Sequence, residues 1–484
     1  MKKFLTVLFL TGLLTAGITA AGNPAKTAGA GRAILGINDD QKRIVVTAIT
    51  ADGSAIQVEG CTVTKLPSGE RTELTATGPK VILKGAITEL DCGGNRLTEL
   101  NVQGLTALQK LFCDDNLLTS LDVSGVTALQ SLSCGENLLT SLDVSGLTGL
   151  RELYCNRNHL SSLDVQSLTA LQDLFCNANK LTSLNVQDLK VLQRLHCNSN
   201  RLTLLDVRDL SALQELDCVG NELTSLDVHG VTALWELECS KNMLTLLDVQ
   251  SLTSLSKLDC SANQLTSLDV RNLAALEKLD CRDNKLTSLD VRGLNTLQKL
   301  YCSENELTSL EIQGLKTLQK LNCYKNKLTS LNVQGLTALQ WLNCGYNELT
   351  TLNLKGLHAL RDLECFNNNL AELDVQDINT LQRLNCYHNK LSTLELSTLH
   401  GLQELCCYDN LFNEKTLIRI LTALPDRKQK KEGRALIYGK KNDPREGTIT
   451  DFSSSAELKA AFEAAKAKNW RFYKRDTVGN EEEV

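Results

Sequence analysis

LQKLFCDDNLLTSLDV, residues 108–123, decides the fold, because close copies of this stretch recur every 21 residues. Cysteine occupies the same place in sixteen successive copies, from Cys92 to Cys407, and asparagine follows three residues later each time, from Asn95 to Asn410. A fixed period of this length is typical of a solenoid, in which one unit cannot bury its own apolar face and neighbouring units must stack. The search for function therefore turns from a single pocket to a long surface.

The segment around each cysteine has the period-two alternation of a strand with one buried face. In KLFCD, residues 110–114, the leucine and the cysteine share one face, and the other three residues share the opposite face. Parallel strands about 4.8 Å apart give a sheet roughly 70 Å long over fifteen steps. With 21 residues in each unit there is little room for a helix, and the convex side should consist of extended segments, turns or 3₁₀ turns.

Two polar columns mark the turns of each unit. The asparagine column lies where the chain leaves the strand, and its amides can pair with backbone groups that stacking would otherwise bury unpaired. A second column of Asp, Asn or Glu, which includes Asp122 and Asp143, precedes the valine of each unit. We interpret the second column as turn chemistry on the back of the coil rather than as metal ligands or catalytic acids.

The motif L-x-x-L-x-C-x-x-N-x-L-T-x-L-D-V of residues 108–123 resembles that of bacterial leucine-rich repeat proteins of the cysteine-ladder internalin type. The resemblance covers about two thirds of the chain. It implies a mostly β leucine-rich repeat solenoid with a parallel sheet on its concave face. It also implies a secreted or surface-exposed protein that binds other proteins or surfaces.

The N-terminal part of the chain departs from the repeat. Lys2 and Lys3, an apolar run and a small-residue cleavage site predict a signal peptide over residues 1–21, too short for a convincing membrane span. Residues 22–42, rich in Ala and Gly, are expected to form a flexible leader. Residues 43–88 should form a small β cap over the open edge of the first coil.

The solenoid is expected to occupy residues 89–410 and to be followed by a C-terminal α/β cap over residues 411–476. Asn413 can begin one helix there, and Ser454 to Glu457 has the pattern of a capping box for a second. A short strand follows at Trp470, and residues 477–484 are expected to be a loose acidic tail.

Eighteen cysteines in an exported protein usually suggest disulfides. The ladder side chains should instead run side by side into the core, where free thiols act as small hydrophobic groups. One thiol per coil among leucines gives no tetrahedral metal set, and we expect neither a metal nor a cofactor. The net charge of −6 argues against a general nucleic-acid or acidic-membrane binder.

The candidate binding surface consists of the outward strand positions three before, one before and one after each ladder cysteine. Nine of the eleven aromatic residues between positions 89 and 410 fall there, which exceeds an even distribution over the 21-residue unit. The nine are Phe112, Tyr154, Phe175, Tyr301, Tyr324, Trp341, Phe366, Tyr387 and Tyr408. The preference of aromatic residues for strands explains part of this enrichment, but an exposed aromatic row is also typical of interface anchors. From Tyr301 onward the aromatic residues occupy successive coils and should form one ridge.

Charges on the same face are sorted as well. An acidic column lies one residue before the cysteine, and a basic column lies three residues before it. The two columns are Asp217, Glu238, Asp259 and Asp280, and Lys257, Lys278, Lys299 and Lys320. One interpretation is mutual neutralisation in water. The other is a polar recognition patch between two aromatic zones, which would orient a partner more than hold it.

The sequence thus predicts an exported, adhesin-like binding protein of the cell surface or the extracellular space, with the periplasm still open. Its partner would be a host receptor, a bacterial surface protein or a glycan, in attachment to host cells, other cells or a biofilm. A self-associating component of a surface or matrix assembly is the alternative. An enzyme is not expected: stacked acids about 5 Å apart resemble a retaining glycosidase pair, but an open sheet offers no pocket to raise one carboxyl pKa.

Overall fold

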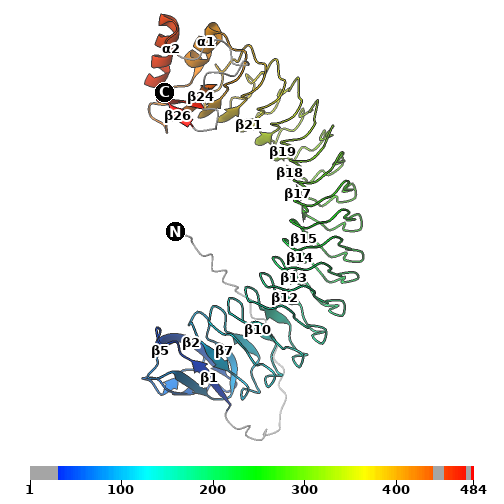
Figure 1. Cartoon of the computed structure of the whole chain (residues 1–484), viewed down its shortest axis with the longest axis vertical. Helices are drawn as coiled ribbons and strands as arrows, with labels where there is room; N and C mark the ends of the chain where they lie inside the picture. The colour runs from blue at the N-terminus through cyan, green and yellow to red at the C-terminus, as the bar shows by residue number, and fades with distance from the viewer. Residues whose placement is uncertain (1–30, 440–451, 476–480) are drawn as a thin grey trace.

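The computed structural model describes residues 31–439, 452–475 and 481–484, which form a curved solenoid with a cap at each end (Figure 1). The strands line the inner, concave side of the arc and the turns lie on its outer side. The leucine-rich repeat solenoid predicted from the 21-residue period is therefore confirmed. The predicted signal peptide, residues 1–21, lies outside the described residues.

One parallel sheet runs the length of the solenoid, with one strand from each cysteine-bearing coil. Neighbouring strands pair in strict register, so that residues 21 apart, such as Leu258 and Leu279, stand side by side. The strands are β7 (Ile87–Asp91), β9 (Lys110–Phe112), β10 (Ser131–Ser133), β11 (Glu152–Tyr154), β12 (Asp173–Phe175), β13 (Arg194–His196), β14 (Glu215–Asp217), β15 (Glu236–Glu238), β16 (Lys257–Asp259), β17 (Lys278–Asp280), β18 (Lys299–Tyr301), β19 (Lys320–Asn322), β20 (Trp341–Asn343), β21 (Asp362–Glu364), β22 (Arg383–Asn385) and β23 (Glu404–Cys406).

The cysteine ladder lies in the core, as its inward register predicted. Every ladder cysteine from Cys92 to Cys407 is 0% exposed, whereas the two additional cysteines, Cys61 and Cys406, are half-buried. None of the eighteen, all of which lie within the described ranges, forms a disulfide. Burial away from water disfavours the thiolate, and it raises the pKa of Cys176 and Cys323 to about 12.

The asparagine ladder ties each coil to the one before it, and its predicted backbone bonding is confirmed. Asn137 shows the pattern: its Nδ2 donates to the carbonyl oxygens of Cys113 (3.0 Å) and Cys134 (3.2 Å). Its Oδ1 accepts from the N–H of Leu118 at 3.0 Å. Buried backbone groups that the parallel strands do not pair are satisfied in this way, coil after coil.

The outer side of each coil is built from extended segments and turns, and no helix occurs in the coils within the described ranges. In the coil of Cys113, Val126 N–H donates to Val123 O and Leu129 N–H donates to Val126 O, which makes two successive turns. Asp122 Oδ1 accepts from Ser124 N–H at 3.0 Å. The second polar column therefore serves the turns, as predicted.

The N-terminal cap extends both sides of the first coil. β2 (Arg43–Thr50) and β5 (Thr72–Thr75) lengthen the concave sheet by antiparallel pairing of β2 with β7. A second antiparallel sheet has the order β4-β3-β6-β1-β8. Its strands are β4 (Lys65–Leu66), β3 (Ile56–Glu59), β6 (Lys80–Lys84), β1 (Arg32–Gly36) and β8 (Glu99–Asn101).

Strand β1 corrects the expected flexible leader over residues 22–42. Residues 32–36 form a central strand that pairs with β6 on one side and with β8 on the other, and Ala33 and Leu35 are buried. This strand was not expected from the sequence, because its five residues, RAILG, lie in a stretch rich in Ala and Gly. Their strand structure comes from the partners on both sides.

The C-terminal cap contains α1 (Glu414–Ala423), β24 (Gly433–Gly439), α2 (Ala456–Ala467), β25 (Trp470–Arg475) and β26 (Glu481–Glu483). Asn413 caps α1 as predicted, accepting from Thr416 N–H at 2.9 Å. Helix α2 begins one residue later than the predicted capping box, because Ser455 accepts from Leu458 N–H and the Ser454 hydroxyl faces Glu414 instead.

Two strands of this cap were not predicted. The two are β24 and β26, whereas β25 is the strand expected at Trp470. β24 and β25 continue the parallel sheet beyond β23, so that the open edge of the last coil is covered. β26 pairs antiparallel with β25, and residues 481–483 of the expected loose acidic tail are therefore part of the sheet.

Candidate binding surface on the concave face

The N-terminal aromatic zone is a short stack of rings on neighbouring strands. The ring centroids of Tyr154 and Phe175 lie 4.9 Å apart, and those of Phe175 and His196 lie 4.2 Å apart. Arg194 lies over Phe175 at 5.6 Å and is bonded to Asp173 through two nitrogens. Burial, and then the nearby carboxylates, raise the pKa of Tyr154 to about 12. These side chains are packed and held in place before any partner arrives.

Phe112 stands apart from this stack. It is half-buried on β9, and the in-register position on the next strand, β10, is Ser133 rather than a ring. Phe112 is thus the one residue of the predicted N-terminal zone that joins no ring contact within the described ranges.

The C-terminal aromatic zone is larger and more continuous. Its members, which we call the aromatic cluster, are Tyr324, Tyr346, Phe366, Tyr387 and Tyr408. The centroids of Phe366 and Tyr387 are 4.8 Å apart, and those of Tyr387 and Tyr408 are 4.6 Å apart, with nearly parallel planes. Tyr324 contacts Phe366 at 5.9 Å across an intervening coil.

Gly345 and Tyr346 explain how the cluster stays continuous across that coil. A Cβ at Gly345 would lie 2.9 Å from the ring of Phe366, so only glycine leaves room for the ring there. Tyr346, one position further along, meets both Tyr324 (5.3 Å) and Phe366 (5.7 Å) edge-on and is 46% exposed. Tyr346 lies outside the three outward positions considered in the sequence, and the glycine within an aromatic column was the signal that could have identified it.

The expected single ridge of exposed rings needs two corrections. Phe366 is only 9% exposed, because the rings of the cluster cover it. Tyr301 and Trp341 form a separate pair, with centroids 6.4 Å apart, on strands β18 and β20. The C-terminal zone is therefore a packed cluster with an adjacent tyrosine–tryptophan pair.

Trp341 forms one wall of a hollow of about 430 Å³ on the concave side. Its indole Nε1 donates to Glu364 Oε1 at 3.3 Å, which fixes the orientation of the ring. The hollow is lined by Tyr301, Lys320, Gln340, Trp341, Arg361, Asp362 and Arg383. A second hollow of about 450 Å³ lies further along the sheet, between β21 and β24, and includes Tyr387 and Glu404.

The acidic column lies between the two aromatic zones. Burial raises the pKa of Asp217 and of Glu238. For Glu238 the neighbouring carboxylates, with Asp217 first, raise the pKa further, and Lys278 opposes them. Asp259 accepts from Ser261 N–H at 3.0 Å, and Asp280 is 2% exposed, bonded to Arg282 at 2.7 and 2.8 Å.

The two charged columns do not neutralise each other by direct contact. Lys257 pairs with Glu236 at 3.3 Å rather than with Asp259, and Asp280 pairs with Arg282 rather than with Lys278. Across the described parts of the chain no ion pair joins a member of one column to a member of the other. Lys299 and Lys320 are exposed on the concave side.

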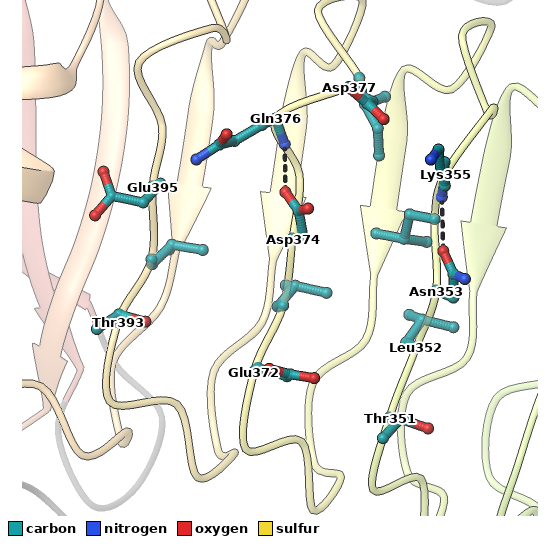
Figure 2. A pocket seen from close by; sticks show the side chains of 14 residues that line it. Thr351, Leu352, Asn353, Lys355, Glu372, Asp374, Gln376, Asp377, Thr393 and Glu395 are labelled. Atoms are coloured by element: carbon teal, nitrogen blue, oxygen red, sulfur yellow. Dashed lines mark hydrogen bonds between the residues drawn. The ribbon is translucent and has the colours of Figure 1, made fainter.

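Another hollow lies on the opposite side of the coils, where Figure 2 shows side chains from three neighbouring turns. Its volume is about 570 Å³. Asp374 Oδ1 accepts from Gln376 N–H and Asn353 Oδ1 accepts from Lys355 N–H, at 3.0 and 3.1 Å. These two polar groups close turns, as elsewhere on the outer side.

Comparison with solved structures places the chain in a family. The functional domain of InlJ from Listeria monocytogenes, which includes a cysteine ladder, is 32% identical with a TM-score of 0.63, over 76% of this chain and 78% of that one. The chain belongs to the cysteine-ladder internalin family of leucine-rich repeat proteins. No protein-family model matches this internalin-like chain, and no curated protein sequence matches it significantly.

Two other solved structures share the fold. A leucine-rich repeat protein of Leptospira interrogans is 30% identical, with a TM-score of 0.62, over 69% of this chain and 93% of that one. The ectodomain of the plant receptor kinase GASSHO1/SCHENGEN3 from Arabidopsis thaliana, solved in complex with Casparian Strip Integrity Factor 2, is 24% identical with a TM-score of 0.60. The match covers 70% of this internalin-like chain and 46% of the receptor chain. Among the described helices, none is long and apolar enough to cross a membrane.

Proposed function

We propose that this chain binds a protein partner through the C-terminal half of its concave face. The observation that carries the proposal is the aromatic cluster beside the Tyr301–Trp341 pair, because packed aromatic side chains with polar surroundings are the usual anchors of protein interfaces. Neighbouring rings already hold each other, so little side-chain freedom remains to be lost on binding. Leucine-rich repeat relatives are typically binding proteins rather than enzymes, which supports the same conclusion.

The proposed setting is the outside of a bacterial cell. The signal-peptide pattern of residues 1–21 and membership of the internalin family favour export, to the cell surface or the extracellular space. The proposed role is attachment to a host cell, to another bacterial cell or within a biofilm, through a host receptor or a bacterial surface protein. The periplasm is the other compartment that export permits.

Self-association is the second candidate, and one observation favours it. The concave face carries an acidic column and exposed lysines side by side, so two copies offer each other opposite charges. Sedimentation of the mature chain over a range of concentrations separates the two candidates. A concentration-dependent assembly that the aromatic variants below abolish would favour the structural role.

The test uses the full mature chain to capture a partner from intact cells, followed by affinity measurement with purified partner. Trp341→Ala combined with Tyr346→Ala should weaken binding at least tenfold, about 1.4 kcal/mol. The variant changes Tyr346 rather than Phe366, because Phe366 is buried and its loss would confound binding with folding. Thr329→Ala with Thr350→Ala, exposed on the outer side of nearby coils, is the matched control.

Circular dichroism and the urea midpoint establish that both double variants remain folded. Wild-type affinity in a folded Trp341→Ala, Tyr346→Ala variant would exclude the C-terminal aromatic zone. The acidic column from Asp217 to Asp280 would then be the next surface to test.

A further inference from the structure

Cations three residues before the ladder cysteines follow a pairing rule. This position forms a column along the concave sheet, because residues 21 apart stand in register. Four of its cations pair with an acid at the same position one coil earlier. The pairs are Lys110–Glu89 (3.2 Å), Arg194–Asp173 (2.6 Å), Lys257–Glu236 (3.3 Å) and Arg383–Asp362 (2.7 Å).

Lys278, Lys299 and Lys320 break this rule, because the coil before each of them presents another lysine. None of the three makes an ion pair within the residues that the structure describes. Lys278 is half-buried near Glu238, whereas Lys299 and Lys320 are exposed. Like charges stacked about 4.8 Å apart repel each other, so an anion bound across them is favoured.

The lysines lead directly into the hollow beside Trp341. Strand β19, which carries Lys320, pairs with strand β20, where Trp341 occupies the same column. The hollow adds Arg361 and Arg383 to the cations, and the rings of Tyr301 and Trp341 supply its apolar wall. We call Lys278, Lys299, Lys320 and Trp341 the lysine–tryptophan strip.

The two acids beside Trp341, Asp362 and Glu364, already have partners. Both oxygens of Asp362 are bonded to Arg383, at 2.7 and 2.8 Å. Glu364 accepts from Trp341 Nε1 at 3.3 Å and from Asn343 Nδ2 at 2.9 Å. The surface therefore has unsatisfied positive charge next to an aromatic wall, in a chain whose net charge is −6.

We propose that the lysine–tryptophan strip binds an acidic, extended segment of the partner protein, with carboxylates on the lysines and an apolar side chain in the hollow. This rests on the proposed function and adds the chemistry of the partner. Lys278 and Lys320 are two coil steps apart, about 9.6 Å, and in an extended segment of the polyproline II type residues three apart lie on one side and span about 9.3 Å. A segment with carboxylates at positions i and i+3 therefore matches the strip. A long polyanion is disfavoured, because the acidic column from Asp217 to Asp259 adjoins the strip.

The test measures fluorescence anisotropy of two labelled peptides with the full chain. One peptide contains Glu-Ser-Ser-Glu-Ser-Phe, and the other has Gln in place of both Glu. We expect the acidic peptide to bind at least tenfold more tightly than the Gln peptide, and more weakly as sodium chloride rises from about 50 to about 300 mM. Lys299→Glu with Lys320→Glu should weaken acidic-peptide binding at least tenfold.

Lys316→Glu is the matched control, since Lys316 is exposed in the same coil as Lys320 but on a turn. It should leave the affinity unchanged. Lys299→Ala with Lys320→Ala removes the charge without reversing it and gives a second variant if the reversal disturbs folding. The urea midpoint of the alanine pair should not fall, because repulsion between stacked lysines is removed.

Equal affinity for the two peptides, no binding of the acidic peptide, or undiminished binding in a folded lysine variant would each overturn the proposal. Binding of a sialylated oligosaccharide at the strip without binding of the acidic peptide would assign it to glycans and also overturn it. The proposed function is judged separately. If the affinity for the partner falls in the Trp341→Ala, Tyr346→Ala double variant but not in the lysine variants, the proposed function still holds.

Discussion

Replacing Asn263 with alanine should destabilise the middle of the solenoid more than an exposed substitution in the same coil. Its Nδ2 donates to the carbonyl oxygens of Cys239, Cys260 and Ser261, at 3.1, 3.1 and 3.2 Å. Its Oδ1 accepts from Leu244 N–H at 3.0 Å, and the residue is only 8% exposed. Alanine supplies none of these groups, so a link between two coils is lost.

The magnitude follows from what each backbone group retains. Leu244 N–H loses its buried partner, which costs about 1–3 kcal/mol. The carbonyls of Cys239 and Cys260 each keep one amide donor, from Asn242 and Asn284, so each lost bond costs about 0.5–1.5 kcal/mol. The change in the free energy of unfolding should therefore be about 2–6 kcal/mol.

Hydrogen exchange followed by mass spectrometry is the suitable assay, because stacked repeats can open locally and a single urea midpoint can miss such a local opening. Peptides that contain Leu244 should exchange roughly a hundredfold faster in Asn263→Ala. Asn263→Asp should be at least as harmful at pH 7, because a carboxylate would face carbonyl oxygens in the interior. Thr266→Ala, exposed in the same coil, is the control, and exchange in Asn263→Ala no faster than in this control would refute the reasoning.

Three further predictions concern the thiols and two carboxylates. A thiol reagent should label at most Cys61 and Cys406 in the folded chain and all eighteen cysteines in denaturant, because the ladder thiols are buried; mass spectrometry that finds several ladder disulfides would contradict this. Asp217→Asn should raise the urea midpoint at pH 7, because burial raises the pKa of Asp217. The stability that Asp217 contributes is fully present below its ordinary pKa of 3.8 and is lost as the pH rises through its pKa in the folded chain. Asp269→Asn should lower the midpoint at pH 7, because the bond from Arg271 lowers the pKa of Asp269 to about 2, and that stability is present above 3.8 and lost as the pH falls towards 2. A shift of the same sign in both variants at pH 7 would count against these environments.

The repeat made the solenoid predictable because a strict 21-residue spacing leaves few ways to stack its units. The inward cysteine, the asparagine bonding and the turn role of Asp122 all follow from one coil and its neighbour. The two caps were harder to predict from the sequence. β1, β24 and β26 form strands only because each pairs with a strand elsewhere in the chain. Their own residues carry little periodicity.

On the candidate binding surface, too, features set by a single repeat were predictable, and features set by contacts between coils were not. Alternation along the strand was enough to predict which face Tyr301, Lys299 and Trp341 share. It did not reveal Tyr346, which lies past the strand in a left-handed backbone conformation (φ 53°) and reaches the cluster only because Gly345 leaves space. The burial of Phe366 likewise depends on rings from other coils, which no single repeat specifies.

Binding by the concave face is tested most directly by hydrogen exchange of the full chain with and without its captured partner. Protection is expected in peptides that span strands β18 to β23, residues 299–406, and it should be centred on the coils of Tyr301, Trp341 and Tyr346. The outer turns of the same coils should exchange equally in both states. Protection confined to those outer turns, with the strands unchanged, would contradict a binding role for the concave face.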